Sequence, residues 1–227
     1  MTQITDHIAE TLERVRFAQS AAGRAAADVT VLAVSKQQSV AAIQAAYQAG
    51  LRNFGENFFQ EAIVKLRELE ALDITWHFIG RIQSNKTRDI AEMFQWVHTV
   101  DRLKIAARLN DQRPHFSPPL NVCIQVNQAG ETQKGGVEES EVAELAHAVM
   151  SLPRLRLRGL MTLPPVTPNP ESNAPLFARL NRLKTVLIED GIPLDTLSMG
   201  MSTDFEVAIG QGSTIVRIGT AIFGPRR

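Results

Sequence analysis

The chain has 227 residues, of which 44% are hydrophobic and 21% charged, a composition typical of an ordinary soluble globular domain. Its 24 basic and 24 acidic residues give a formal net charge of zero, which argues against recognition of nucleic acid through a strong basic excess. A single cysteine, Cys123, excludes an internal disulfide, and no apolar run approaches the length of a membrane-spanning helix.

The first 19 residues predict an amphipathic helix. Ile4, Ile8, Leu12, Val15 and Phe17 recur at near-helical spacing along it. The segment lacks the basic start and the apolar block of a signal peptide, so we expect a cytoplasmic protein.

Short apolar runs and helical segments then alternate to the end of the chain. The predicted strands are residues 29–34, 51–54, 74–79, 96–100, 120–126, 155–161, 194–199 and 214–218. The predicted helices between them are residues 40–49, 58–69, 86–94, 102–110, 138–150, 174–190 and 205–210. Strict alternation leaves an open doubly wound sheet or a closed barrel.

Eight short units favour a single α/β domain over residues 1–227, a (β/α)8 TIM-type barrel with an extra N-terminal helix. The strand at 51–54 has the weakest pattern. The proline-dense segment 163–170 is predicted to be a rigid loop after the sixth strand, with a proline-rich ligand for another protein as the alternative.

In a barrel, chemistry lies at the carboxyl ends of the strands. The first strand runs into Ser35 and Lys36, which places Lys36 at that rim. One interpretation is a solvated lysine that closes a strand. The other is an amine partly desolvated by its apolar strand and therefore a competent imine-forming nucleophile.

Asn57 and His77 are the candidates from the next two strands. Asn57 follows Gly55 and Glu56, where a helix N-cap is the competing interpretation. If Trp76 and Phe78 share one face of the third strand, His77 takes the other and points into the barrel. There it lies beneath a ligand or is an ordinary hydrogen-bonded core histidine.

The loops after the last two strands resemble a phosphate site. Backbone N–H groups at glycine turns and helix N-termini, supported by hydroxyls, bind phosphate well, and barrels often place such sites here. The candidates are Gly200, Ser202 and Thr203 after the seventh strand, and Gly219 and Thr220 after the eighth. Capping of the next helix by Ser202 or Thr203 is the simpler alternative.

Arg217 is unusual because Val216 and Ile218 flank it in an apolar strand. An interior guanidinium needs an acceptor, and a phosphate or a pyridine nitrogen would serve. An outward-facing arginine paired with a carboxylate is the alternative.

Other polar residues predict less. The five histidines show no zinc-ligand spacing with Cys123, so we expect no metal, and we expect Cys123 to be a buried small hydrophobe. Lys134 lies in a glycine-rich loop, 127–136, which is either a lid that reaches a ligand or an ordinary solvated loop.

An ordered set of motifs, from about residue 8 to the C-terminus, resembles the pyridoxal phosphate homeostasis protein family, also called the proline-synthetase-associated barrel proteins. The motifs are VLAVSK at 31–36, FGEN at 54–57, HFIG at 77–80 with QSNK at 83–86, RGLM at 158–161, MGMS at 199–202 with Asp204, and VRIGTAIFG at 216–224. Each fragment is weak alone, but the ordered set is highly specific.

The resemblance implies a fold similar to the N-terminal barrel of alanine racemase, with pyridoxal 5′-phosphate (PLP) held as a Schiff base on Lys36. It implies that Ser202, Gly219 and Thr220 bind the phosphate and that Met199 and Gly200 line the same pocket. Asn57 and His77 match positions near the cofactor ring. Arg217 matches a residue near the pyridine nitrogen or the phosphate, where an arginine weakens the ring as an electron sink.

The function implied by the resemblance is intracellular PLP (vitamin B6) and amino-acid homeostasis, with delivery of PLP to PLP-dependent apoenzymes as a further role. Racemases of this fold carry a second β domain, and we expect none here, so we expect a PLP carrier without established catalytic residues, and a monomer. A weak PLP-dependent amino-acid racemase is the alternative, and an interaction module that docks on apoenzymes is the third.

Overall fold

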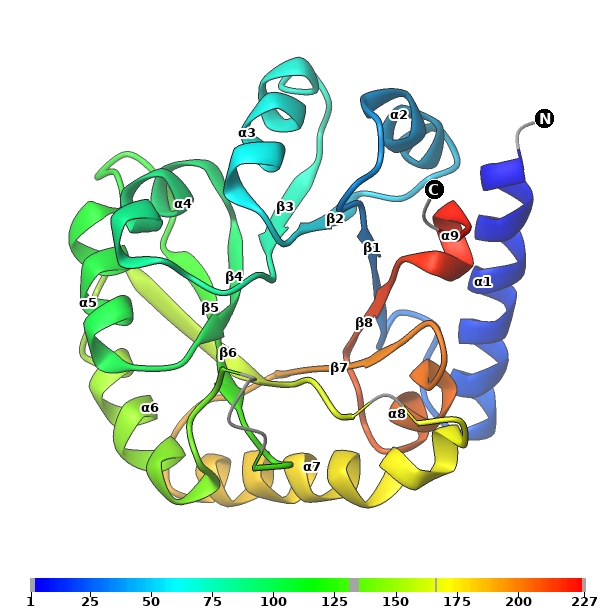
Figure 1. Cartoon of the computed structure of the whole chain (residues 1–227). Helices are drawn as coiled ribbons and strands as arrows, with labels where there is room; N and C mark the ends of the chain where they lie inside the picture. Colours follow the sequence, from blue (N-terminus) through cyan, green and yellow to red (C-terminus); the bar gives the residue numbers. More distant parts are fainter. Residues whose placement is uncertain (1–2, 131–134, 166, 226–227) are drawn as a thin grey trace.

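A computed structural model describes residues 3–130, 135–165 and 167–225 of the chain. Eight parallel strands close into a barrel in the order β1 to β8, with β8 pairing back onto β1 (Figure 1). Helices surround the barrel on its outside (Figure 1). The predicted (β/α)8 barrel, including its additional N-terminal helix, is therefore confirmed.

The strands are β1 Thr30–Val34, β2 Asn53–Glu56, β3 Thr75–Phe78, β4 Trp96–Val100, β5 Leu120–Val126, β6 Leu155–Thr162, β7 Thr196–Met201 and β8 Ile215–Ile218. The α-helices are α1 Gln3–Ala21, α2 Val40–Gln48, α3 Phe59–Glu68, α4 Thr87–Met93, α5 Leu103–Gln112, α6 Val142–Met150, α7 Ala174–Glu189, α8 Phe205–Gly210 and α9 Thr220–Phe223. Short 3-10 turns, η1 Ser84–Lys86, η2 Glu139–Glu141 and η3 Pro170–Asn173, precede α4, α6 and α7.

The largest difference from the predicted elements is at α6, which was predicted from residue 138 but begins at Val142, after η2. The strands β2 and β7 are shifted by two residues at both ends. The predictions began two residues too early at β2 and β7, because Leu51 and Leu194 are buried although they precede their strands. Burial of a connecting residue beneath a helix gives the same apolar pattern as a strand. The sequence also did not predict α9, a four-residue helix directly after β8.

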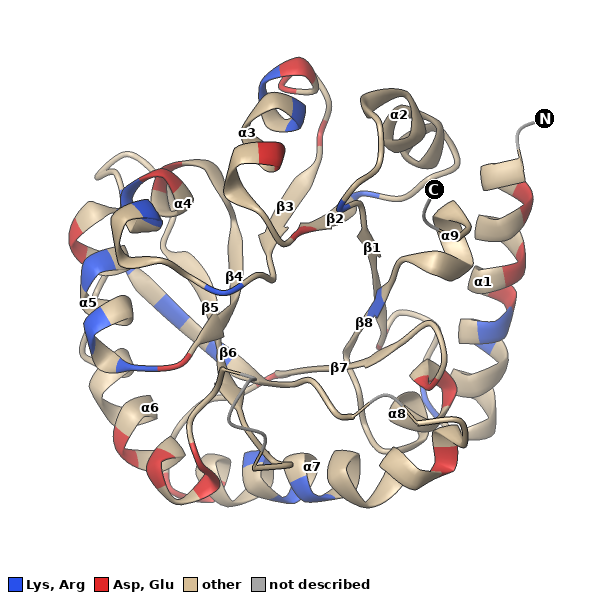
Figure 2. Ribbon diagram, viewed as in Figure 1, with Lys and Arg blue, Asp and Glu red and all other residues tan. Residues whose placement is uncertain are grey.

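The interior of the molecule has two apolar layers. The large one lies between the strands and the helices, and a small one inside the barrel consists of Leu32, Val34, Ile79 and Ile215, with Trp96 against it. Polar side chains occupy much of the remaining barrel interior. Figure 2 shows a basic segment on β8, whereas many of the other charged segments lie on the surrounding helices. Arg217, the basic residue of β8, is buried.

The N-terminal helix packs along the outside of the barrel against α2, α8 and α9 (Figure 1). Ile8 and Val15 of α1 belong to the large apolar layer. Arg14 of α1 pairs with Glu206 of α8, and its guanidinium carbon lies 4.7 Å from the centre of the Phe205 ring. This helix therefore holds the elements that carry the last two strand-to-helix loops.

Candidate functional site

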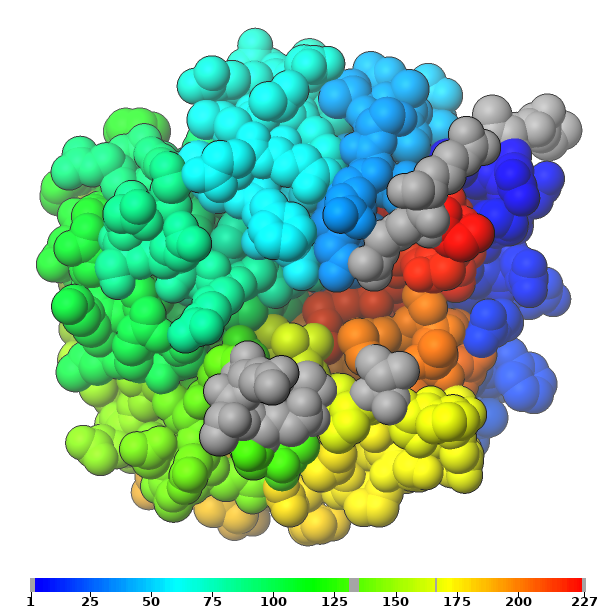
Figure 3. All heavy atoms as spheres, in the orientation of Figure 1, coloured from blue at the N-terminus to red at the C-terminus, as the bar shows by residue number. Residues whose placement is uncertain are grey.

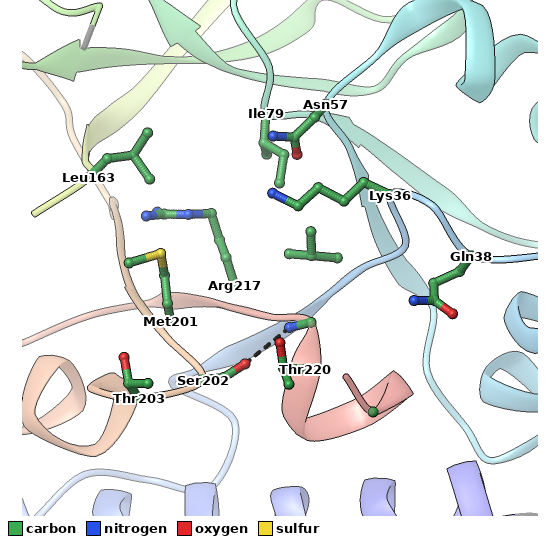
Figure 4. Close-up of a pocket in the computed structure, with 13 residues that line it drawn as sticks. Lys36, Gln38, Asn57, Ile79, Leu163, Met201, Ser202, Thr203, Arg217 and Thr220 are labelled. Atoms are coloured by element: carbon green, nitrogen blue, oxygen red, sulfur yellow. Dashed lines mark hydrogen bonds between the residues drawn. The ribbon is translucent and has the colours of Figure 1, made fainter. Parts of the chain in front are cut away.

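A cavity of about 340 Å³ opens at the carboxyl ends of the strands. Figure 3 shows the hollow between the blue β1 side and the orange and red β7–β8 side of the molecule, and Figure 4 shows its lining. The lining residues are Val34, Lys36, Gln38, Asn57, Ile79, Leu163, Met201, Ser202, Thr203, Arg217, Gly219, Thr220 and Gly224. Six of the nine residues that the family resemblance nominated thus meet at one cavity, and Thr203, a further candidate, joins them.

Lys36 follows directly after β1 and is half-buried. Its side chain points into the cavity, toward Asn57 and Ile79 (Figure 4). Ser35, immediately before it, is fully buried. The strand end therefore places the Lys36 amine at the cavity, and its role as an imine-forming nucleophile stays a prediction.

Hydroxyl and amide groups from two loops meet on another wall of the cavity. The Ser202 hydroxyl accepts hydrogen bonds from the backbone N–H groups of Gly219 and Ala221, at 3.3 and 3.4 Å. Thr203 and Thr220 line the cavity beside it (Figure 4). The two loops are thus joined at a cluster of hydroxyls and N–H groups, the chemistry that suits a phosphate.

The interpretation of Ser202 or Thr203 as the cap of α8 is wrong. The N-cap of α8 is Asp204. Its carboxylate accepts from the Met201 N–H at 2.7 Å and from the Asn173 side-chain amide at 2.8 Å. Asp204 shapes the loop and leaves the hydroxyls of residues 202 and 203 to the cavity wall.

Asn57 is not a helix cap either. The N-cap of α3 is Phe58, and it makes no side-chain cap bond. The Asn57 side-chain oxygen is buried and has no hydrogen-bond partner among the described residues. Asn57 nevertheless belongs to the cavity lining.

Arg217 lies inside the barrel, 4% exposed. Its Nη1 donates to Ser198 O at 2.6 Å and Ser198 Oγ at 2.8 Å, and its Nη2 donates to Thr162 O at 2.8 Å. Burial lowers the pKa of the guanidinium to about 10, against the nearby charge of Asp204, which raises it. The alternative of an outward arginine paired with a carboxylate is therefore wrong, and protein oxygens supply the acceptors that its interior position requires.

His77 points into the barrel as predicted, but it lies outside the cavity lining. Its Nε2 faces Asn53 Oδ1 at 3.0 Å, and its Nδ1 faces His98 Nε2 at 2.9 Å. His98 Nδ1 in turn lies 2.8 Å from Ser198 Oγ. Burial lowers the pKa of His77 to about 3 and that of His98 well below its ordinary value.

In this buried chain of hydrogen bonds, from Asn53 through the two histidines to Ser198, the direction in which each proton is donated is fixed. With Asn53 Oδ1 as acceptor, His77 donates from Nε2 and accepts at Nδ1, so His98 donates from Nε2 and accepts the Ser198 hydroxyl proton at Nδ1. The Ser198 oxygen accepts from Arg217. Two neutral histidines thereby lie on a hydrogen-bonded line that leads to the guanidinium in the cavity wall.

Met199 and Gly200 also lie outside the cavity lining. Met199 is fully buried in the layer between barrel and helices. Gly200 has φ +92°, and a Cβ there would stand 2.6 Å from the Cβ of Ala208. Met199 and Gly200 therefore pack against the side of the β7–α8 segment that faces the helices, away from the cavity. Lys134, the predicted lid residue, lies outside the described residues.

Sequence reasoning missed several members of the site. The cavity is also lined by Gln38, Ile79, Leu163 and Met201. Each follows or ends a strand, so the rule that barrel sites lie at the carboxyl ends of the strands could have nominated them. The period of two that links His98 to Trp96 could have placed that histidine inside the barrel. Ser198 carried no comparable pattern.

Cys123 is fully buried, as expected, and burial raises the pKa of its thiol to about 12. Within residues 3–130, 135–165 and 167–225, no cluster of three metal-ligating side chains exists. No helix in those ranges is long and apolar enough to cross a membrane.

The family model of the alanine racemase N-terminal domain matches residues 9–227 of the chain. The pyridoxal phosphate homeostasis protein of Pseudomonas aeruginosa is 56% identical, with 100% of this chain and 97% of that protein covered. The protein of the same name from Escherichia coli K12 is 49% identical and covers 100% of this chain and 98% of its own length.

A solved structure of PipY from Synechococcus elongatus, with PLP bound, is also similar. It is 35% identical in sequence and superposes with a TM-score of 0.85 over 98% of this chain and 100% of that one. The likeness thus spans nearly the whole barrel.

Proposed function

The chain belongs to the alanine racemase N-terminal domain family, together with the pyridoxal phosphate homeostasis proteins, and on that premise we propose that it binds PLP in the cavity at the carboxyl ends of its strands. Lys36 is the amine that holds the cofactor covalently. The protein serves PLP and amino-acid homeostasis by holding and releasing PLP.

A single observation carries the proposal. An amine and a cluster of hydroxyl and N–H groups face one cavity, Lys36 on the β1 side and Ser202 with Thr220 on the β7–β8 side (Figure 4). PLP carries an aldehyde and a phosphate on one ring, so its two reactive ends require these two kinds of group. Asn57 and the guanidinium of Arg217, which also line the cavity, are further polar groups near the ring.

The residues of the chain would divide the work as follows. Lys36 Nζ would form a C–N bond to the aldehyde carbon of the cofactor as water leaves. Ser202, Thr220 and the N–H groups at Gly219 would hold the phosphate. When bound, the cofactor supplies an electrophilic carbon and an electron-withdrawing ring. Apolar Val34, Ile79 and Leu163 exclude water from part of the cavity.

The lining favours binding and exchange over racemisation. A two-base racemase needs a proton donor on the face opposite the lysine. Among the described lining residues there is no carboxylate, imidazole, thiol or phenol. Tyr47 lies elsewhere, with its ring 4.0 Å from the guanidinium carbon of Arg52.

Three finer points belong to the same proposal. We infer delivery of PLP to PLP-dependent apoenzymes, because a reversible bond to one lysine permits exchange with another amine. We also infer a cytoplasmic monomer. Sedimentation equilibrium tests the oligomeric state, and transfer to an apoenzyme is followed by recovery of its activity with and without a PLP trap.

Borohydride trapping tests the covalent assignment. PLP is added to the purified protein, the absorption spectrum is recorded before and after borohydride reduction, and the labelled peptide is mapped. We expect one label, on the peptide with Lys36, and no stable label in Lys36→Ala. The matched control is Lys104→Ala, an exposed lysine on α5, which should label like the wild type.

A label spread over surface lysines, or one retained by Lys36→Ala, would contradict the assignment. Solvent deuterium exchange at the α-carbon of L-amino acids separates carrier from racemase. Exchange well above that with free PLP would favour the enzyme.

A further inference from the structure

A cluster of charges lies directly behind the segment that carries Lys36. Lys65 of α3 donates from Nζ to Glu56 Oε1 at 2.9 Å and also to the carboxylate of Glu61. Lys65 is 5% exposed, and Glu56 is fully buried. Glu56 ends β2, whereas Glu61 and Lys65 both lie in α3, so the cluster joins two consecutive elements of the chain.

Lys65 and Glu56 of this cluster are hydrogen-bonded to Ser35, the residue before Lys36. The carbonyl oxygen of Ser35 accepts from Lys65 Nζ at 2.7 Å. The Ser35 hydroxyl donates to Glu56 Oε1 at 2.6 Å, and its backbone N–H donates to Gly55 O at 3.0 Å. Every polar group of Ser35 is thereby bound to β2 or to Lys65.

Glu61 of the same cluster is hydrogen-bonded to Gln37, the residue after Lys36. The backbone N–H of Gln37 donates to Glu61 Oε1 at 2.5 Å. Gln37 has φ +61°, the only positive φ of a non-glycine residue in the part of the chain that the structure describes. A left-handed conformation is unfavourable for an L-residue with a side chain, so the surroundings must hold it. Glu61 supplies one such restraint.

Stability alone accounts poorly for these contacts. A buried ion pair is on average no more stabilising than apolar residues of similar volume. The cluster also leaves Glu56 Oε2 buried without a hydrogen-bond partner among the described residues, and burial raises the pKa of this carboxyl. Its hydrogen bonds go instead to the two residues that flank Lys36.

We propose that Lys65, with Glu56 and Glu61, is a positioning residue that fixes the backbone on both sides of Lys36 and so directs the Lys36 amine at the carbon it attacks. This inference rests on the proposed function. Lys65 acts through the main chain, touching neither the cavity lining nor the cofactor. Misplacement of a reacting group by about 1 Å can cost 100-fold, so loss of these contacts is expected to weaken covalent attachment by about tenfold or more.

The test compares two ligands that share a phosphate. PLP forms the covalent bond, whereas pyridoxine 5′-phosphate has an alcohol in place of the aldehyde and cannot. For Lys65→Met we expect the Kd of PLP to rise about tenfold or more and the borohydride-trapped fraction on Lys36 to fall. The Kd of pyridoxine 5′-phosphate should stay within about twofold, because the phosphate wall is untouched.

A matched control separates positioning from general destabilisation. Arg113 is also 5% exposed, and it donates to the carbonyl oxygens of Ala91, Phe94 and Pro118, remote from the cavity. Arg113→Met removes a buried cation without touching Ser35 or Gln37. It should lower the melting temperature and leave both Kd values unchanged.

Glu61→Ala keeps the test open if Lys65→Met does not fold, because the Glu61 side chain is 28% exposed and its loss leaves Lys65 paired with Glu56. We expect a smaller rise in the Kd of PLP alone. Glu68→Ala, at an exposed site on the same helix, is its control and should bind like the wild type.

The outcomes are distinguishable. Wild-type protein without a trapped adduct on Lys36 would overturn the proposed function and this inference together. A wild-type adduct with unchanged PLP affinity in both Lys65→Met and Glu61→Ala would overturn the inference alone. Equal weakening of PLP and pyridoxine 5′-phosphate would also overturn it, since it would point to a distorted cavity.

Discussion

Acid should destabilise the fold through the two histidines inside the barrel. His77 and His98 are 1% and 0% exposed, and each accepts a hydrogen bond at a ring nitrogen that protonation would block. Burial lowers the pKa of His77 to about 3 and lowers that of His98 well below 6.5. In the unfolded chain both histidines titrate near 6.5.

The sign follows from proton counting. Between pH 6.5 and about 3 the unfolded chain binds a proton at His77 that the folded protein does not, so the free energy of unfolding falls as the pH falls. The slope approaches about 1.4 kcal/mol per pH unit for each histidine. From pH 7 to pH 5 the loss is therefore about 2 kcal/mol for His77, and His98, whose pKa is lowered in the same direction, adds to it.

Urea unfolding at pH 7 and pH 5 measures this loss, with His98→Gln as the variant. The glutamine can still donate to His77, but Ser198 loses its acceptor, so we expect a cost of about 1–3 kcal/mol at pH 7. The loss between pH 7 and pH 5 should be smaller than in the wild type, because one titrating group is gone. His115→Gln, at an exposed site, is the control and should keep the wild-type pH dependence. A His98→Gln protein that loses as much stability as the wild type would refute the reasoning.

Three further predictions concern the loop after β7, the cavity wall and the cysteine. Gly200→Ala should lower the free energy of unfolding by roughly 2–3 kcal/mol in urea titration, since φ is +92° and the new Cβ would stand 2.6 Å from that of Ala208; an unchanged midpoint would contradict the placement. Ser202→Ala should raise the Kd of both PLP and pyridoxine 5′-phosphate about 10- to 100-fold, the worth of a hydrogen bond to a charged group, while borohydride at saturating PLP still labels Lys36. Cys123 should not react with a thiol reagent in the native protein and should react fully in urea, because it is fully buried and its pKa is about 12; rapid native labelling would contradict both.

Much of the architecture was predictable because the local pattern and the final burial agree. The strands at 96–100 and 120–126 and the helix at 205–210 coincide with β4, β5 and α8. Where they disagree, the prediction fails at an end. Leu51 is buried yet precedes β2, since it packs in the large apolar layer before the strand begins.

The position of residues at the carboxyl ends of the strands predicted which of them could line a common site, and the geometry of the closed barrel determined which of them do. Lys36, Asn57, Ser202, Arg217, Gly219 and Thr220 line one cavity. Met199 does not, because successive side chains of a strand face opposite sides and its own faces the helices. The capping interpretations of Asn57 and Ser202 failed because α3 and α8 begin one and two residues later than such caps require.

The sequence by itself determined the alternation of strands and helices, the rim position of Lys36 and the family to which its ordered motifs belong, because these depend on residue type and spacing along the chain. Only the tertiary structure decided that Lys65 binds Ser35, that Glu61 binds Gln37, and that two histidines form a line to Arg217. The residues in such contacts lie far apart in the sequence: His77 and His98 are 21 positions apart, and His98 and Ser198 are 100 positions apart. Such contacts exist because closing the barrel brings the strand ends together, and no local pattern encodes which buried polar groups will then face one another.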